Sequence, residues 1–215
     1  MTCEQCLSGG ANVFGKREAD RQLKRYRKKG PGKTTRLLLD ALAAEGVAGM
    51  TLLDIGGGVG SIALELFKRG ATAATEVDAS PAYLAVAKSE ATRLGVGDRV
   101  NTRQGDFVAV ADETPSADIV TLDRVICCYP DMVALVGQSA AKATRLYGVV
   151  YPRDLWWIRA LRNVGNAALH LFRLPFTLFI HPTTRVNAII RSAGLVQRYQ
   201  RDVGYWQVAV YARPA

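Results

Sequence analysis

The sequence contains few of the residues that hold metals or cross-link small secreted proteins, with four cysteines and two histidines in 215 residues. The cysteines form two adjacent pairs, Cys3 with Cys6 and Cys127 with Cys128, which do not make a secreted-type disulfide framework. Cys3 and Cys6 have the spacing of half a zinc site, but no second half follows, so we expect no metal. No signal-peptide pattern and no membrane-spanning apolar run is present. These absences favour a protein of the reducing cytoplasm.

Acidic residues are also in deficit, with 28 Lys and Arg against 19 Asp and Glu, for a net charge of +9. Half of residues 14–29 are Lys or Arg. This excess favours an anionic partner, either nucleic acid, an acidic membrane surface or a carboxylated small molecule, and does not choose among them. The basic segment has two readings of equal weight, a solvated helix face and a binding face for phosphate or carboxylate.

Glycine is concentrated in one place, the segment Thr51–Ser61, which places four glycines within five residues after a short apolar run. This pattern predicts a buried strand, a tight turn and a helix that Ser61 caps and Gly70 ends. Such a turn lets a ligand approach the backbone closely. The spacing Gly56-x-Gly58-x-Gly60 differs from the Gly-x-Gly-x-x-Gly of dinucleotide sites, and this favours another adenosine-bearing cofactor over NAD.

Helical and strand patterns alternate along most of the chain, as in α/β proteins. The pattern predicts helices at 14–29, 34–45, 62–69, 81–94, 132–145 and 183–193, strands at 51–55, 71–77, 100–103, 118–123 and 148–151, a helical insertion within 153–175, and a final antiparallel hairpin of strands at 196–201 and 206–211. Carboxylates stand at or after successive strand ends, at Asp54, Asp78, Asp106 and Asp123. In open α/β sheets ligands bind at these carboxyl ends, so we expect the four side chains to share one site.

The order of these features resembles that of class I S-adenosylmethionine-dependent methyltransferases. The resemblance covers residues 51–131 and implies a Rossmann-like seven-stranded sheet, mostly parallel with an antiparallel last strand. It implies that S-adenosylmethionine is the cofactor, with Asp78 accepting from the ribose hydroxyls, Asp106 accepting from the adenine amino group and Phe107 flanking the ring. The remaining cofactor-binding residues that we expect are Asp54, Gly56, Gly58, Gly60, Ala79 and Asp123.

More distantly, the chain resembles the magnesium-protoporphyrin O-methyltransferases, through Leu122-Asp123 followed by Tyr129-Pro130, through Pro152 and through His181 ahead of the last helix. That family commonly has His before the Tyr-Pro pair, where this chain has Cys128. The implied organisation is one methyltransferase domain, 1–215. It comprises an N-terminal helical lid (1–45), a cofactor-binding core (46–152), a helical insertion over the acceptor site (153–181), and the last helix with the C-terminal hairpin (182–215).

Methyl transfer depends mainly on holding the acceptor close to and in line with the methyl group, and a base is needed only where a proton must leave. His181, in an expected loop, is the candidate base, with a structural loop histidine as the equal alternative. Tyr129 is the candidate to donate to, or orient, an acceptor oxygen, and Arg153 to pair with a carboxylate. Trp157, Phe14 and Tyr26 are further candidates for substrate contact.

Two cysteines beside the fourth strand raise the hypothesis of a nucleophile, but the surrounding Pro-Cys context of cytosine methyltransferases is missing, and buried packing is the favoured role. We therefore expect an enzyme that methylates a small molecule on a carboxylate or hydroxyl oxygen or on a thiol. Two alternatives remain open. One is an RNA-modifying methyltransferase, which the basic residues 14–29 suggest. The other is a membrane-surface protein, or a methyltransferase with a lipophilic acceptor, that uses residues 153–180 as an interfacial helix.

Overall fold

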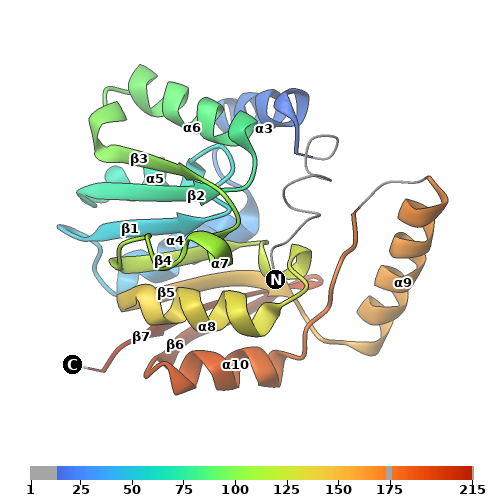
Figure 1. Ribbon diagram of the computed structural model, residues 1–215. Helices are drawn as coiled ribbons and strands as arrows, with labels where there is room; N and C mark the ends of the chain where they lie inside the picture. The colour runs from blue at the N-terminus through green and yellow to red at the C-terminus, as the bar shows by residue number, and fades with distance from the viewer. Residues whose placement is uncertain (1–13, 173–175, 215) are drawn as a thin grey trace.

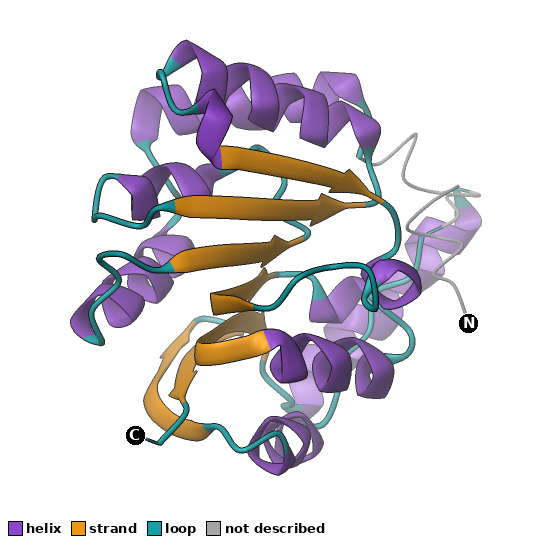
Figure 2. Cartoon of the chain, turned by 60° about the vertical axis from the view of Figure 1, so that its left-hand side comes forward, coloured by secondary structure: helices purple, strands orange, loops and turns teal. Residues whose placement is uncertain are grey.

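The computed structural model describes residues 14–172 and 176–214 and has a single mixed sheet of seven strands between two layers of helices (Figure 1, Figure 2). The strand order is β3-β2-β1-β4-β5-β7-β6. The strands are β1 (Thr51–Ile55), β2 (Ala73–Asp78), β3 (Val100–Gln104), β4 (Ala117–Asp123), β5 (Ala143–Pro152), β6 (Val196–Val203) and β7 (Trp206–Ala212). Only β7 runs antiparallel to its neighbours β5 and β6. The expected Rossmann-like seven-stranded sheet is thus confirmed.

The helices divide between the two faces of the sheet. They are α3 (Lys16–Lys29), α4 (Lys33–Ala44), α5 (Ser61–Phe67), α6 (Pro81–Arg93), α7 (Phe107–Val110), α8 (Met132–Lys142), α9 (Trp156–Leu171) and α10 (Thr183–Ser192). One apolar core packs α8 and α10 against the sheet, and a second packs α4 and α5 against the other face. The strands β1 and β4 and the second half of β5 are buried almost throughout because both faces of the sheet are covered there.

Two local expectations about element ends were wrong. Ser61 does not cap α5, since it is the first helical residue and the cap position is Gly60, in a left-handed conformation. The helix expected to reach Arg145 ends at Lys142, because Ala143 already pairs with Ala117 of β4 and both are buried. Tertiary pairing therefore overrides the helical propensity of this segment.

Other ends follow the local sequence. Ser80 caps α6 by accepting from the amide of Tyr83, and Pro81 occupies the first turn. Asp106 caps α7 in the same way, accepting from the amide of Val108. These caps fix the chain where it leaves β2 and β3, so the residues that follow the two strands are held in place.

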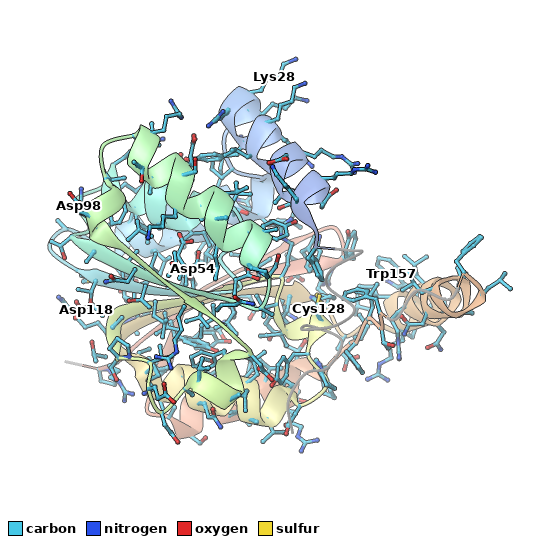
Figure 3. The ribbon with its side chains drawn as sticks, turned by 45° about the horizontal axis from the view of Figure 1, so that its top comes forward. Lys28, Asp54, Asp98, Asp118, Cys128 and Trp157 are labelled. Carbon is cyan, nitrogen blue, oxygen red and sulfur yellow. The ribbon has the colours of Figure 1, made fainter. Side chains whose placement is uncertain are left out.

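The helix α9 departs from this compact arrangement. It stands away from the sheet, beside the carboxyl ends of the strands (Figure 1, Figure 3). No helix among residues 14–172 and 176–214 is long and apolar enough to cross a membrane.

Candidate functional site

The carboxyl ends of β1, β2 and β4 open into a cavity of about 440 Å³ that α3 and α4 cover. This volume lies in the usual range of small-molecule sites. The expected site residues that line it are Phe14, Tyr26, Asp54, Gly56, Gly58, Asp78, Ala79, Asp106, Phe107, Asp123 and Tyr129. Four of the expected residues do not line the cavity: Gly60, Arg153, Trp157 and His181. Residues far apart in sequence thus meet in one chamber, as the strand-end rule requires.

The glycine turn is shaped by backbone conformations that other residues rarely adopt. Gly56, Gly58 and Gly60 have φ of 67°, 60° and 75°. A β-carbon on Gly56 would lie 2.5 Å from Cγ2 of Val125, so this position must be glycine for steric reasons as well. Gly60 faces the interior, where a β-carbon would lie 2.8 Å from Glu76 Oε1. Its role is therefore in packing the turn, while Gly56 and Gly58 present backbone to the cavity.

Asp78, at the end of β2, has its two carboxylate oxygens on separate backbone amides. Oδ2 accepts from the amide of Gly58 at 3.1 Å, and Oδ1 accepts from the amide of Ser80 at 2.8 Å. Burial raises the pKa of this carboxyl, and the two amides oppose that rise. Asp78 thus ties the glycine turn to the start of α6, with Ala79 in the cavity wall between them.

Asp54 is the most deeply buried acidic group of the cavity wall. Its Oδ1 accepts from the hydroxyl of Thr121 at 2.7 Å, and its Oδ2 has no partner among the described residues. Burial raises the pKa of Asp54 to about 7. Beneath the turn, burial raises the pKa of Glu76 to about 8, with the charges of Asp54 and Asp78 adding to the effect. A buried carboxylate oxygen without a partner fits a site built to receive a cationic group.

Asp106 and Tyr129 form a buried pair at another end of the cavity. The Tyr129 hydroxyl donates to Asp106 at 2.8 Å from Oδ1 and 2.9 Å from Oδ2. Burial and this bond both raise the pKa of Tyr129. Phe107 follows Asp106 in the wall and is buried. The geometry makes Tyr129 a support of Asp106 and not an unengaged hydroxyl facing an acceptor.

His181 lies behind Tyr129. Its Nε2 is 3.0 Å from the backbone oxygen of Tyr129, and its ring stacks on Phe179. Burial lowers the pKa of His181, which opposes protonation. Since the ring is absent from the cavity wall, a direct role as proton acceptor is not what this geometry favours. The position instead fits the alternative of a loop histidine that holds the backbone.

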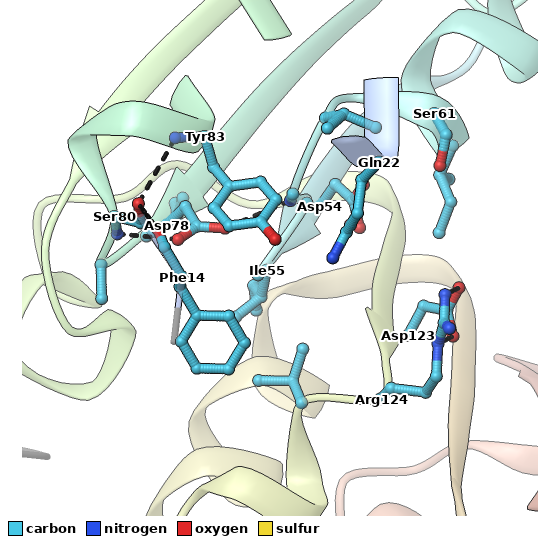
Figure 4. A pocket seen from close by; sticks show the side chains of 18 of the residues that line it. Phe14, Gln22, Asp54, Ile55, Ser61, Asp78, Ser80, Tyr83, Asp123 and Arg124 are labelled. Atoms are coloured by element: carbon cyan, nitrogen blue, oxygen red, sulfur yellow. Dashed lines mark hydrogen bonds and ion pairs between the residues drawn. The ribbon is translucent and has the colours of Figure 1, made fainter. Parts of the chain in front are cut away.

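The carboxylate at the end of β4, Asp123, is also hydrogen-bonded within the chain. Asp123 accepts from the Thr35 hydroxyl of α4 at 2.6 Å and from Nε of Arg124 at 3.0 Å. Arg124 has φ of 64°, and no other described non-glycine residue has a positive φ. Backbone strain of this kind is common at functional sites. Figure 4 places Asp123 and Arg124 together on one side of the cavity, across from Phe14 and Tyr83.

The lid contributes more of the cavity than the sequence indicated. Phe14 and Tyr26 line it as expected, and Gln22 and Arg25 of α3 line it as well, together with Tyr83 of α6 in the core. The Phe14 carbonyl accepts from the Ser80 hydroxyl at 2.8 Å, and the Tyr26 hydroxyl donates to Glu65 at 2.8 Å. No sequence signal marked Gln22 or Tyr83, since both lie within ordinary helical patterns.

Arg153 and Trp157 occupy places other than those expected. The Arg153 guanidinium pairs with Asp202 at 2.9 Å, and its backbone amide donates to Tyr205. Arg153 therefore fixes the turn between β6 and β7 and has a carboxylate partner from its own chain. Trp157 lies on α9, whose residues form no part of the cavity wall. The coverage of the acceptor site by the insertion therefore stays a prediction.

Cysteine has a limited place in the site. Cys127 is buried, while Cys128 lines the cavity, and their sulfur atoms lie 3.7 Å apart without a disulfide. Cys3 and Cys6 lie outside the described residues. Within the part of the chain that the structure describes, no group of three or more His, Cys, Asp or Glu side chains is arranged to hold a metal ion.

Comparison with known proteins agrees with this geometry. Residues 52–145 match the family model described as a methyltransferase domain. The chain is 37% identical over 109 residues to a release factor glutamine methyltransferase of Cereibacter sphaeroides, a match covering 50% of this chain and 38% of that protein. The chain therefore spans well under two thirds of the length of that curated relative.

Two solved structures show the same fold. Magnesium protoporphyrin IX methyltransferase from Synechocystis PCC 6803, solved with bound SAH, aligns with a TM-score of 0.71 at 18% identity, covering 94% of this chain and 97% of that one. An O-methyltransferase family protein from Burkholderia thailandensis aligns with a TM-score of 0.72 at 15% identity, covering 96% and 62%.

Proposed function

We propose that this chain, which has the sheet order of class I methyltransferases and a methyltransferase domain over residues 52–145, transfers a methyl group from S-adenosylmethionine to a small-molecule acceptor. The observation that carries the proposal is the meeting of the glycine turn with Asp54, Asp78 and Asp106 in one cavity. The cofactor supplies an electrophilic methyl group on a sulfonium. The residues of the chain supply binding, alignment and the exclusion of water.

The assignment of binding roles follows the chemistry of the donors and acceptors. Asp78 accepts hydrogen bonds at the end of β2 and would receive the ribose hydroxyls, with Ala79 beside it. Asp106, which Tyr129 holds, would accept from the adenine amino group, and Phe107 would lie against the ring. The partnerless oxygen of Asp54 would face a cationic group of the ligand, near the backbone of Gly56 and Gly58.

The acceptor would then occupy the space between the lid and the end of β4. Arg124 is paired with Asp123, while Arg25 also lines this chamber, and the charge of Arg25 favours an anionic acceptor, methylated on a carboxylate or hydroxyl oxygen. A thiol acceptor stays an alternative, because Cys128, Asp123 and Gln22 also reach the wall. The lid supports the choice of a small molecule, because Phe14 and Tyr26 are bonded to the core and a volume of about 440 Å³ must hold cofactor and acceptor together.

Binding of the cofactor tests the first step of this proposal. Calorimetry with S-adenosylmethionine should show that Asp78→Ala lowers affinity by about tenfold to a hundredfold, since buried amides and ribose hydroxyls lose their acceptor. Asp98→Ala is the matched control, because Asp98 is exposed at the far edge of the sheet (Figure 3) and should leave the affinity unchanged. An Asp78→Ala variant that binds as tightly as the natural chain would overturn the ribose assignment.

Transfer of label tests the acceptor class. The chain is incubated with S-adenosylmethionine labelled at its methyl group and with separate fractions of small molecules, lipids, RNA and protein. Label in the small-molecule or lipid fraction supports the proposal. Label in RNA would favour the alternative that the exposed cations of α3 suggest, and label in protein would align the chain with its release-factor relative.

A further inference from the structure

The helix α9 exposes its apolar side to solvent, the reverse of an ordinary surface helix. Trp156, Leu161, Val164, Leu171 and Phe172 are exposed at 82%, 60%, 69%, 78% and 73%. Exposed Ala160, Ala167 and Ala168 lie on the same side, so that Trp156, Ala160, Val164, Ala168 and Phe172 follow one another four residues apart, with Leu161, Ala167 and Leu171 beside them. The result is one continuous apolar face along the whole helix, larger than scattered surface residues produce.

The opposite side of α9 accounts for its attachment to the body. Ile158 is buried there. The Asn166 side chain donates to the carbonyl of Leu178 and accepts from its amide, both at 2.9 Å. Arg159 pairs with Asp154 at 2.5 Å. The orientation of α9 is therefore fixed by polar contacts on its inner side, so the outward apolar face is a built feature.

The charge of the chain indicates what covers this face. Residues 156–171 contain no Asp or Glu, and the whole chain has a net charge of +9. Two copies that met through this face would each carry this net positive charge and would repel one another. An anionic lipid surface instead complements the net charge of the chain, while Trp156 and its apolar neighbours enter the boundary between the headgroups and the acyl chains.

We propose that α9 is an interfacial helix that docks this chain on an anionic membrane surface, through the exposed face Trp156, Leu161, Val164, Leu171 and Phe172. The helix would lie in the plane of the interface. The attachment also places the cavity near the lipid, because Phe176, which follows α9, packs edge-on against Phe14 of the cavity wall with ring centres 5.5 Å apart. This inference goes beyond the proposed methyl transfer and does not depend on it.

Vesicle flotation tests the docking directly. The full chain is mixed with vesicles of phosphatidylcholine alone and with vesicles of equal parts phosphatidylcholine and phosphatidylglycerol. We expect flotation with the anionic vesicles and a shift of tryptophan emission to shorter wavelength. The triple variant Trp156→Ser, Leu161→Gln and Val164→Gln should lower the bound fraction by about tenfold or more, because the apolar contact supplies much of the binding.

The control variant replaces three partly exposed apolar side chains elsewhere, Leu94→Gln, Val133→Gln and Val196→Gln, which are 43%, 43% and 50% exposed. It should float as the natural chain does. Circular dichroism and S-adenosylmethionine affinity check that the α9 variant is folded, and they report on the proposed function separately from vesicle binding.

Four results would overturn the inference. The natural chain could stay unbound with both vesicle types, or the α9 variant could float undiminished. Equal flotation with neutral vesicles would contradict the proposed preference of α9 for an anionic lipid surface. Light scattering could show a concentration-dependent dimer that the α9 variant no longer forms, with no binding to vesicles. The exposed apolar face of α9 would then be an interface between two copies of this chain.

Discussion

The hydroxyl of Tyr129 lies 2.8 Å from one carboxylate oxygen of Asp106 and 2.9 Å from the other. His181 reaches the backbone oxygen of the same tyrosine at 3.0 Å. The two residues that the sequence suggested for catalysis thus form a chain that ends on Asp106, at the cofactor side of the cavity. Their expected effect on the reaction is through position, and each can be tested separately.

Tyr129→Phe removes both hydroxyl contacts to Asp106 and leaves the ring in place. Loss of a donor to a buried carboxylate costs about 1–3 kcal/mol, so we expect S-adenosylmethionine affinity to fall by about tenfold. Tyr147→Phe is the control, because Tyr147 is also buried and bonded, to Ser139, but lies away from the cavity. Both variants should lose some stability in urea, and only Tyr129→Phe should lose affinity. If Tyr129→Phe binds S-adenosylmethionine with unchanged affinity but loses turnover, Tyr129 instead acts on the methyl acceptor.

His181→Ala should raise the KM for S-adenosylmethionine a few-fold and leave the shape of the pH profile of kcat unchanged, because His181 holds the Tyr129 backbone. His181→Gln should restore most of the affinity, since its side-chain amide reaches the position of Nε2 and can still donate to that carbonyl. Steady-state kinetics across pH separate the two roles. A large fall in kcat, with the loss of one limb of the pH profile, would show that His181 accepts a proton after all.

Asp54 should couple cofactor binding to proton release. Burial raises the pKa of its carboxyl to about 7, and a cationic ligand group favours the ionised form. Affinity should therefore rise with pH, by at most about tenfold per pH unit below pH 7, and level off above it. Calorimetry in buffers of different ionisation enthalpy counts the released protons. Asp54→Asn should abolish the release, and Asp118→Asn, at the opposite end of the sheet (Figure 3), should preserve it. Equal release from Asp54→Asn would contradict the assignment.

The same carboxyls set the stability of the ligand-free chain. A carboxyl whose pKa is raised on folding binds more protons when folded, so the free energy of unfolding falls as pH rises from its unfolded pKa to its folded pKa. For Asp54 and Glu76 this window runs from about 4 to about 7 and about 8. Urea unfolding across this range should lose at most about 1.4 kcal/mol per pH unit for each group. Glu76→Gln should flatten the upper end of the window.

An ion-pair cluster fastens the lid helix α3 to the core. Arg27 and Arg93 both bond to Glu90, whose carboxylate is buried and whose pKa they lower to about 2. Arg27→Gln should speed hydrogen exchange in α3 and raise the dissociation rate of S-adenosylmethionine a few-fold. Lys28→Gln makes the same charge change on the exposed side of α3 and should alter neither. Unchanged exchange in Arg27→Gln would mean that Phe14 and Tyr26 hold the lid without this pair.

The sequence by itself determined the alternation of strands and helices, the glycine turn and the carboxylates at Asp54, Asp78, Asp106 and Asp123. These follow from local periodicity, from the backbone freedom of glycine and from the rule that parallel strands end together. Side-chain partnerships required the tertiary structure. Tyr129 meets Asp106 across 23 positions, Thr35 meets Asp123 across 88, and Arg153 turns to Asp202, which no local pattern encodes.

The outward direction of the apolar face of α9 is also decided by the tertiary structure. An apolar stripe of helical period predicts burial, and here only the inner contacts of Ile158 and Asn166 decide that the stripe faces solvent. Local sequence fixes which side chains share a helix face, because the helical period is set by the backbone. Which way that face points depends on contacts between distant segments, and the fold alone supplies these.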